Sequence, residues 1–280
     1  KMKTLLYTLI FVFSITGLCA QELGLMSYNI RLATESDGEN AWSKRKEFLK
    51  NQVLFYAPDV MGIQEALPEQ MQYLNDNLKD YKSLGVGREG ENKGEFSALF
   101  YNAAKLDVLK SDTFWLSETP DTISTGWDAA LPRICTYALF QDKSSNEKFY
   151  VFNTHFDHVG VEARKKASEL ILTKMNELNT ENVDVFLTGD LNLEPDSAPI
   201  AVLKSDLFDT YDIAPMGPFG PSGTYNGFNF DEPVTRRIDY IFQGKSNTNL
   251  VLKHAVLSDS KNLRYASDHL PVYVLIKLQP

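Results

Sequence analysis

Short apolar runs alternate with amphipathic stretches along most of this chain. Runs rich in β-branched and aromatic residues predict strands, because these side chains pack well on a pleated surface. Such runs cover about residues 24–32, 59–65, 134–142, 149–155, 184–188, 237–243, 250–258 and 272–278, and residues 81–116 carry alternating strands, among them 96–101 and 106–116. Apolar residues spaced three or four apart predict helices over 43–56, 68–78, 161–178 and 198–203.

The polar segments between these elements predict turns and loops. Residues 143–146 separate two strands as a hairpin turn would, and Pro58 stops the helix that precedes it. Longer loops are expected over 117–132, rich in Ser, Thr, Pro and Asp, and over 215–234, rich in Gly and Pro. No repeat, low-complexity tract or linker interrupts the series, so residues 21–280 are expected to form one domain.

The first twenty residues are typical of an export signal. Two lysines flank the start, residues 5–18 are apolar, and Cys19-Ala20 offers a small-residue cleavage site. A lipoprotein anchored through Cys19 is the rival interpretation, but Leu18 occupies a position where such signals favour a small residue. We therefore expect residues 1–20 to be removed and the protein to be periplasmic or extracellular. The apolar run is short for a membrane span, and no second one follows.

The remaining chain is acidic. The signal contains two of the 28 basic residues and none of the 37 acidic ones, which leaves 26 basic and 37 acidic side chains, a net charge of −11. This charge disfavours tight non-specific binding to a polyanion, although a local basic patch can still steer one. Cys135 is the single cysteine in 21–280, so no intramolecular disulfide forms there and stability must come from the hydrophobic core.

One predicted strand ends in a pair of polar side chains suited to metal binding or catalysis. Asp190 and Asn192 follow the run 184–188 two positions apart, so they point to the same side. Carboxylate and amide oxygens suit Mg²⁺, a water nucleophile or a phosphate. A Gly-Asp-x-Asn sequence also forms ordinary turns. Other polar clusters at the ends of predicted strands favour the chemical interpretation.

These other clusters are Asn29, Glu65, residues 153–158, residues 237–240 and residues 267–271. A parallel or mixed sheet gathers its functional groups at such strand ends. In chain order, the segments MSYNIR, GIQEA, NTHFDH, GDLN, RIDYIF and SDHLP resemble the motifs of the endonuclease/exonuclease/phosphatase superfamily. This superfamily includes DNase I, neutral sphingomyelinases, deadenylases and inositol polyphosphate phosphatases. Each motif alone is weak, but the ordered set spans essentially the whole chain after the signal.

The resemblance implies an α/β (α+β) fold, a four-layer sandwich in which two mixed β-sheets pack face to face with helices outside. It also implies a Mg²⁺ site, in which Mn²⁺ is expected to substitute. Glu65 would be the principal ligand, assisted by Asn29 and Asp268. An oxygen-rich cluster agrees with this metal, since Cys135 lies far from every motif and no histidines are paired at zinc spacing.

The catalytic roles are also implied by the resemblance. Asp190 and Asn192 match the pair that orients the attacking water and the phosphate. His269 matches the general base or phosphate contact, held by Asp239. His155 matches the second family histidine, which binds the phosphate or protonates the leaving oxygen. Independently of the family, a histidine that titrates near pH ~6.5 can serve as acid or base, and a partner carboxylate raises its basicity.

Three further residues are candidates for substrate binding. Asn153 and His158 belong to the NTHFDH motif, although His158 could instead order the loop around His155. Arg133 follows the loop 117–132, and its guanidinium suits a second phosphate. His254 lies within an apolar strand and is expected to be structural.

Two branches of the family do not fit. Apurinic endonucleases carry an acid where this chain has Arg31, two positions after the asparagine of the first motif. Inositol polyphosphate phosphatases show Trp-Cys-Asp-Arg where this chain has Arg236-Arg237-Ile238-Asp239. Deadenylase-like, DNase-like and small-phosphoester branches all stay open.

We therefore expect an exported, Mg²⁺-dependent phosphoester hydrolase of the phosphodiesterase or nuclease type, in which water attacks directly. A phosphatase of small sugar, lipid or inositol phosphates is the first alternative. A catalytically inactive binding module with the same fold is the second, and the intact motif residues argue against it. Few basic residues lie near the motifs, so the expected substrate is a small molecule or a single-stranded nucleic acid. Neither a stable membrane span nor a protein partner is evident from the sequence.

Overall fold

The computed structural model describes residues 22–246 and 249–279. The expected export signal, residues 1–20, lies outside them. Within the described ranges, no helix combines the length and hydropathy that a bilayer-spanning segment needs.

Two six-stranded sheets form the centre of the molecule, in the orders β11-β12-β1-β2-β4-β3 and β5-β6-β7-β8-β10-β9. The first sheet contains β1 (Glu22–Asn29), β2 (Val60–Ala66), β3 (Tyr81–Leu84), β4 (Phe96–Asn102), β11 (Leu250–Val256) and β12 (Val272–Lys277). The second contains β5 (Leu106–Trp115), β6 (Ile134–Asp142), β7 (Lys148–His155), β8 (Asp184–Asp190), β9 (Leu207–Asp209) and β10 (Asp239–Gly244). Strands β1 and β2 are parallel, as are β7 and β8, and the other neighbours are antiparallel. Both sheets are therefore mixed, as expected.

The two sheets pack face to face through apolar side chains. Leu25 and Val274 of the first sheet belong to one buried cluster with Val151, Phe186 and Ile241 of the second. Side chains alternate between the two faces of a strand, so every second residue of these strands enters this layer. Burial of this layer holds the sheets together, because removal of apolar surface from water is the main favourable contribution to folding.

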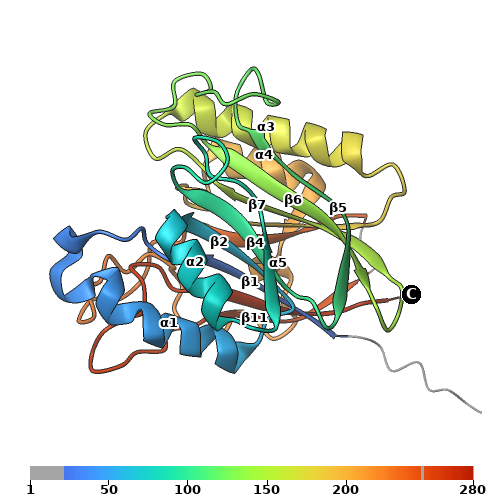
Figure 1. Cartoon of the computed structure of the whole chain (residues 1–280). Coiled ribbons are helices and arrows are strands. Elements are labelled where there is room, and N and C mark those ends of the chain that lie inside the picture. Colours follow the sequence, from blue (N-terminus) through green and yellow to red (C-terminus); the bar gives the residue numbers. More distant parts are fainter. Residues whose placement is uncertain (1–21, 247–248, 280) are drawn as a thin grey trace, which may run out of the picture.

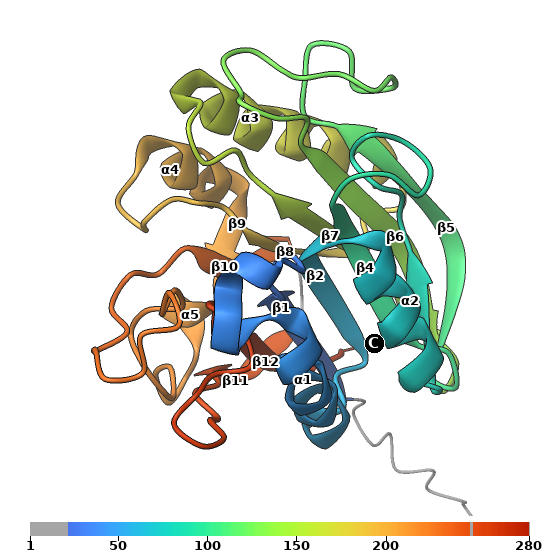
Figure 2. The ribbon, with the colours of Figure 1, turned by 60° about the vertical axis from the view of Figure 1, so that its left-hand side comes forward.

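Helices cover the two outer faces. The helices on the first sheet are α1 (Trp42–Tyr56) and α2 (Pro68–Asn77), and those on the second are α3 (Val161–Leu178) and α4 (Ala198–Asp206). Figure 1 shows α3 and α4 above the sheets and α1 and α2 below them. The two helix pairs lie on opposite sides in the turned view as well (Figure 2). The predicted four-layer sandwich is confirmed.

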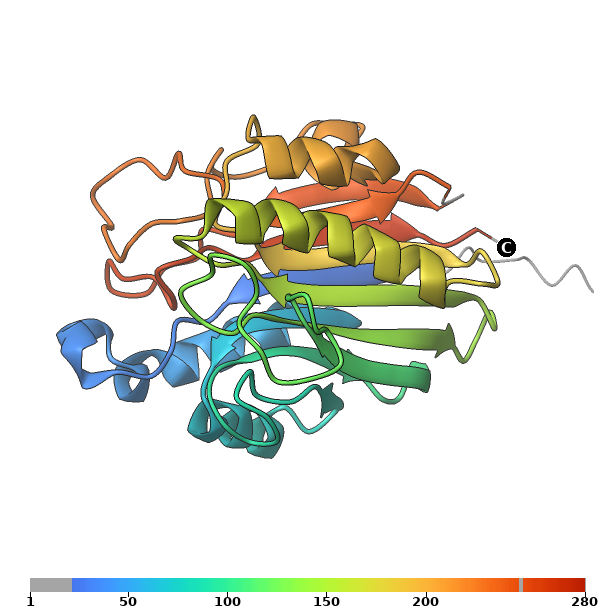
Figure 3. The ribbon, with the colours of Figure 1, turned by 90° about the horizontal axis from the view of Figure 1, so that it is seen from above.

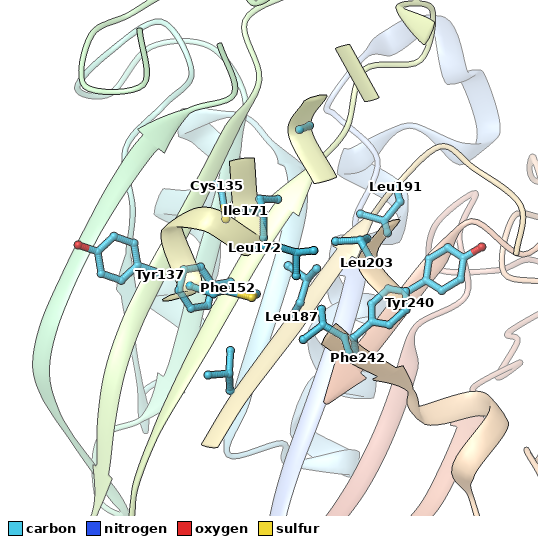
Figure 4. Packing of buried hydrophobic residues seen from close by; sticks show 14 of the residues in the cluster. Cys135, Tyr137, Phe152, Ile171, Leu172, Leu187, Leu191, Leu203, Tyr240 and Phe242 are labelled. Atoms are coloured by element: carbon cyan, nitrogen blue, oxygen red, sulfur yellow. The ribbon is translucent and has the colours of Figure 1, made fainter. Parts of the chain in front are cut away.

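The core between the second sheet and its helices follows directly from the strand and helix periods (Figure 4). Tyr240 and Phe242 lie two positions apart on β10, so their rings point to the same face of the sheet. The rings stack at a centroid distance of 5.3 Å. Leu187 of β8 belongs to the same cluster as Ile171 of α3 and Leu203 of α4. The apolar stripe of each helix therefore fixes the helix to the sheet.

Three short elements were not predicted from the sequence. They are the 3-10 helix η1 (Glu35–Asn40), strand β9 and helix α5 (Thr210–Ile213). Elements of three to six residues complete too few periods to leave a recognisable hydrophobic pattern. The predicted end of α1 is confirmed, since Ala57 adopts a left-handed conformation with φ of 44° directly before Pro58.

Candidate active site

The polar residues of the motifs meet at one edge of the two sheets. Strands β1, β2, β7 and β8 end at this edge, and β10 begins there. Asp190 pairs with His155 across the β8–β7 ladder and with Asp239 across the β8–β10 ladder. Asn29 ends β1 beside the end of β2, which carries Glu65. Figure 3 shows the connections at this edge on the left, away from the C-terminus.

Asp190 is the centre of this arrangement. Its Oδ2 accepts a hydrogen bond from Nδ2 of Asn29 at 2.9 Å, and it lies 3.5 Å from Nε2 of His155 and 3.7 Å from Nε2 of His269. Its Oδ1 accepts from the backbone N–H of Asn192 at 2.9 Å. Burial, followed by the negative charge of Asp239, raises the pKa of Asp190 to about 7. This carboxyl group can therefore exchange a proton near neutral pH.

His269 is paired with Asp239. Its Nδ1 lies 2.8 Å from Oδ2 of Asp239, and both side chains are buried. Burial by itself lowers the pKa of His269, but the carboxylates of Asp239 and Asp190 outweigh it and raise the pKa well above the ordinary value of 6.5. The imidazolium form of His269 is thus favoured at neutral pH.

His155 has the opposite character. Burial lowers its pKa well below 6.5, and the positive charges of Arg133 and His269 lower it further. Nδ2 of Asn192 donates to the carbonyl of Phe156 at 3.0 Å and lies 3.1 Å from Nε2 of His155. Nε2 of His155 therefore accepts a hydrogen bond, which requires a neutral ring.

The backbone is unusual at three positions of the site. Glu65, Arg31 and Asn192 have φ values of 65°, 55° and 51°, in the left-handed region that side chains larger than glycine rarely adopt. The register between β2 and β4 shifts between Ile63 and Ala66, so Glu65 lies on a bulge. Bulges and left-handed residues redirect side chains, and both features concentrate at functional sites.

Glu65, Asp190 and His155 together offer a set of metal ligands. One ligand atom from each of them lies within 4.8 Å of the others. The carboxylates of Glu65 and Asp190 are the oxygen ligands that Mg²⁺ and Mn²⁺ prefer, whereas imidazole is more usual at zinc, iron or copper. Nε2 of His155 also already accepts a hydrogen bond from Asn192. Asp190, Asp239 and His269 form a second such group, in which Asp239 and His269 are hydrogen-bonded to each other. Glu65 and Asp190 therefore fit a metal best.

Asn29 and Asp268, the other expected metal ligands, have different surroundings from Glu65. Nδ2 of Asn29 donates to Oε1 of Glu65 at 3.0 Å and to Oδ2 of Asp190 at 2.9 Å, so it orients the two carboxylates. Its Oδ1 accepts from the backbone N–H of Arg31. Asp268 lies 3.8 Å from Nε of Arg31 and outside the three-residue group. Asn29 thus has an orienting position, and Asp268 pairs with a cation.

Most residues of this site line one cavity of about 510 Å³, and Asn29 and Asp239 lie behind its wall. Its charged and ionisable lining consists of Arg31, Arg88, Arg133, Arg236, Glu65, Glu95, Asp190, Asp268, His155, His158 and His269. The remaining lining residues are Asn192, Tyr225, Leu32, Leu131 and Ile238. A cavity of this size accommodates a small molecule, since ligand pockets commonly measure ~300 to 1,000 Å³.

Arg133 and His158 meet at the cavity wall. Nη2 of Arg133 lies 3.0 Å from Nδ1 of His158, and Nε of Arg133 lies 3.5 Å from the carboxylate of Asp157. Asp157 also accepts from the backbone N–H groups of Ala130 and Gly160, so it joins the loop 117–132 to the start of α3. Asp157 thus orders the loop, and Arg133 and His158 remain candidates for substrate contact.

Asn153 lies in the interior between the sheets and does not line the cavity. Its Nδ2 donates to the carbonyls of Ile63 and Ala98 at 2.8 and 2.9 Å. Its Oδ1 accepts from Gln64 at 2.7 Å and from Thr188 at 3.0 Å. Three of these four bonds join Asn153 to the facing sheet, and the bond from Thr188 lies within its own sheet. The described contacts thus give Asn153 a role in joining the sheets, and substrate binding by it stays a prediction.

The cavity also includes residues that sequence reasoning did not assign. Arg88, Glu95 and Tyr225 lie in loops or at their ends, outside every motif. The ring of Tyr225 packs edge-on against His269 at a centroid distance of 5.1 Å. The guanidinium carbon of Arg236 lies over the same tyrosine ring, 5.2 Å from its centroid. No periodic signal marks such residues, because loop position depends on tertiary contacts.

Comparison with known proteins agrees with this site. Residues 26–269 match the model of the Endonuclease/Exonuclease/phosphatase family, and this stretch contains every candidate site residue named above. The chain belongs to this family. It is therefore a member of a group of phosphoester hydrolases whose members generally use a divalent metal.

Solved structures show the same fold. A mannosyl-6-phosphatase of Bacteroides thetaiotaomicron is 36% identical, with a TM-score of 0.86 over 91% of this chain and 99% of that one. Another family protein of B. thetaiotaomicron is 35% identical, with a TM-score of 0.88 over 93% and 99%. Tyrosyl-DNA phosphodiesterase 2 of Danio rerio is 22% identical over 266 residues, which cover 90% of this chain and 66% of that protein. Similar proteins thus include both a phosphatase and a phosphodiesterase.

Proposed function

We propose that this protein is an exported, Mg²⁺-dependent phosphatase that hydrolyses small phosphomonoesters such as sugar phosphates. The observation that carries the proposal is the cavity of about 510 Å³ whose lining includes Glu65, Asp190, Asn192 and both site histidines. The similarity to a mannosyl-6-phosphatase supports the monoester over the diester that the motifs alone favoured.

The chemistry follows from the charges of the site. Mg²⁺ held by the carboxylates of Glu65 and Asp190 would partly neutralise the negative charge of the phosphoryl oxygens. The imidazolium of His269 adds a positive charge held in place by Asp239, and it can donate a hydrogen bond to the phosphate. Asp190 and Asn192 lie side by side at this edge of the cavity, where their oxygen and amide groups can orient the attacking water and the phosphate.

A substrate panel tests this function. Purified protein is assayed with mannose 6-phosphate, phenyl phosphate, bis(p-nitrophenyl) phosphate, single-stranded RNA and plasmid, with chelator and with added Mg²⁺, Mn²⁺ or Zn²⁺. We expect the monoesters to be hydrolysed fastest, chelator to stop turnover, and Mg²⁺ or Mn²⁺ to restore it. Faster cleavage of the diester or RNA, or chelator-resistant activity that only Zn²⁺ alters, would contradict the proposal.

Two histidine variants serve as controls for the panel. His269→Ala removes a group of the site and should lower kcat by ~10² or more, the usual scale for an acid–base residue. His254→Ala changes a buried histidine outside the cavity and should leave turnover within about threefold of the wild type. Export is checked separately by the mass of the protein recovered from the periplasmic or extracellular fraction, which should lack residues 1–20.

A further inference from the structure

One wall of the cavity contains arginines that are already paired with carboxylates. Nη2 of Arg88 lies 2.9 Å from Oε1 of Glu95, and both side chains are mostly buried. Nε of the neighbouring Arg133 lies 3.5 Å from the carboxylate of Asp157. Each guanidinium on this wall therefore has its charge compensated within the protein.

The loop that carries Arg88 and Glu95 is held in a defined shape. The backbone N–H of Arg88 donates to the carbonyl of Glu95 at 2.9 Å, and Nε1 of Trp115 donates to the carbonyl of Arg88 at 2.8 Å. A Cβ on Gly87 would lie only 2.0 Å from the carbonyl oxygen of Lys93, so the loop closes tightly on itself. The ion pair is thus built into the cavity before a ligand arrives, which lowers the entropic cost of binding.

The charge balance argues against a second phosphate on this wall. Arg88 lies beside Glu95 and Arg133 beside Asp157, so neither guanidinium of this wall is left without an opposite charge. A site for a second phosphate would need uncompensated cations, because a phosphate repels the carboxylate that neutralises its arginine. The arrangement instead suits one phosphate at the metal ligands and a neutral remainder of the substrate.

A guanidinium beside a carboxylate presents donors and acceptors side by side. Arginine has five N–H donors and a carboxylate has two acceptor oxygens, so the Arg88–Glu95 contact leaves bonding capacity on both groups. Two adjacent hydroxyls, each both donor and acceptor, complement such a pair. We propose that Arg88 and Glu95 form a hydroxyl-binding subsite that selects phosphomonoesters carrying a vicinal diol, as in a pyranose ring. This inference rests on the phosphatase function proposed above.

The test compares two monoesters that differ in their hydroxyl groups. Initial rates are measured for the wild type, Arg88→Met and Glu95→Gln with mannose 6-phosphate and with phenyl phosphate. Loss of charged hydrogen bonds should raise KM for mannose 6-phosphate roughly 10- to 100-fold. For phenyl phosphate, kcat/KM should stay within about threefold of the wild type. The double variant should lose no more than the worse single variant, because the two residues act as one unit.

Arg264→Met is the matched control. Arg264 also faces a glutamate, with Nη2 3.8 Å from Glu39, but it lies outside the cavity, so both substrates should be unaffected. Thermal unfolding of each variant shows whether the fold persists. Fructose 1,6-bisphosphate forms a third arm: a preference of the wild type for it that Arg88→Met abolishes would overturn the inference in favour of a second phosphate.

Binding in chelator separates this inference from the proposed function. Calorimetric titration of mannose 6-phosphate reports affinity even if the protein hydrolyses no monoester. The subsite is supported if the wild type binds mannose 6-phosphate more tightly than phenyl phosphate and Arg88→Met removes the difference. Equal affinities in the wild type, or equal losses for both ligands in Arg88→Met, would overturn it.

Discussion

At the scale of single residues, the histidines show how the surroundings decide the chemistry of one side chain. Two nearby carboxylates raise the pKa of His269 and favour its charged form, whereas burial, and after it the positive charge of Arg133, lowers the pKa of His155 and favours its neutral form. His254 has neither role. It is buried on β11, its Nδ1 lies 3.0 Å from the hydroxyl of Thr210, and burial lowers its pKa to about 4. The residue type is the same, and the local field differs.

The depressed pKa of His254 predicts a pH dependence of stability. The unfolded chain binds this proton near pH ~6.5, whereas the folded protein binds it only near pH 4. The unfolded state therefore gains protons first as the pH falls from about 6.5 to 4, and the free energy of unfolding decreases in that window. We expect a contribution of about 2 to 3 kcal/mol between pH 7.5 and 4.5.

Denaturant unfolding of His254→Gln at several pH values measures this contribution. The stability difference between wild type and variant should shrink by that amount on acidification. Asn176→Ala, an exposed change on α3 that involves no titratable group, should keep a constant difference from the wild type. A constant difference for His254→Gln as well would show that the buried ring is not destabilised by acid.

At the scale of elements, strand ends carry the site and the contacts between sheets set its geometry. Glu65 belongs to the first sheet and Asp190 to the second, yet Nδ2 of Asn29 contacts both carboxylates. The relative position of the two sheets therefore decides whether these ligands meet. Asn153 helps to fix that position, because its amide joins β7 to the carbonyls of Ile63 and Ala98 on the facing sheet.

Asn153→Ala should destabilise the protein by about 2 to 4 kcal/mol, since it leaves several buried polar groups without their partner. KM of the folded fraction should change less than about threefold, because the side chain does not line the cavity. Urea unfolding and steady-state kinetics below the transition measure the two effects. Asn176→Ala, at an exposed position on α3, is the matched control. A large rise in KM with unchanged stability would return Asn153 to the substrate site.

At the scale of the whole molecule, net charge and cavity shape act together on substrate choice. The described chain contains no basic run longer than three residues, and residues 21–280 have a net charge of −11. Three arginines of the cavity, Arg31, Arg88 and Arg133, each lie beside a carboxylate. Arg237, another basic residue near the motifs, is buried against Asp209, with Nη1 2.8 Å from Oδ2. These features oppose a continuous track for a long polyanion.

We therefore expect weak binding of nucleic acid, with a salt dependence shallower than that of a protein that follows a duplex. Each neutralised phosphate contributes about −0.9 to the slope of log K against log salt, so engagement of two or three phosphates gives a slope no steeper than about −3. KM for a duplex and for a short phosphodiester, measured across a salt series, tests this expectation. A slope near −6 with strong preference for the duplex would place the protein with the DNase-like nucleases.

The sequence by itself determined the strands, the main helices and the identity of the groups at the strand ends. Hydrophobic runs are local signals, and β7 and β8 appear in the sequence essentially where they form in the structure. The motif residues could be found for the same reason, because Glu65, His155 and Asp190 lie at or near the last positions of their strands.

Only the tertiary structure decided which of these groups lie together in the same site. Asn153 and His155 are two residues apart in one motif, yet one connects the sheets and the other lines the cavity. Arg88 and Glu95 belong to none of the motifs. Only the folding of their loop against Trp115 brings them to the cavity wall. The physical reason is that a local pattern specifies burial and direction along one element, whereas a site depends on distances between elements that packing sets.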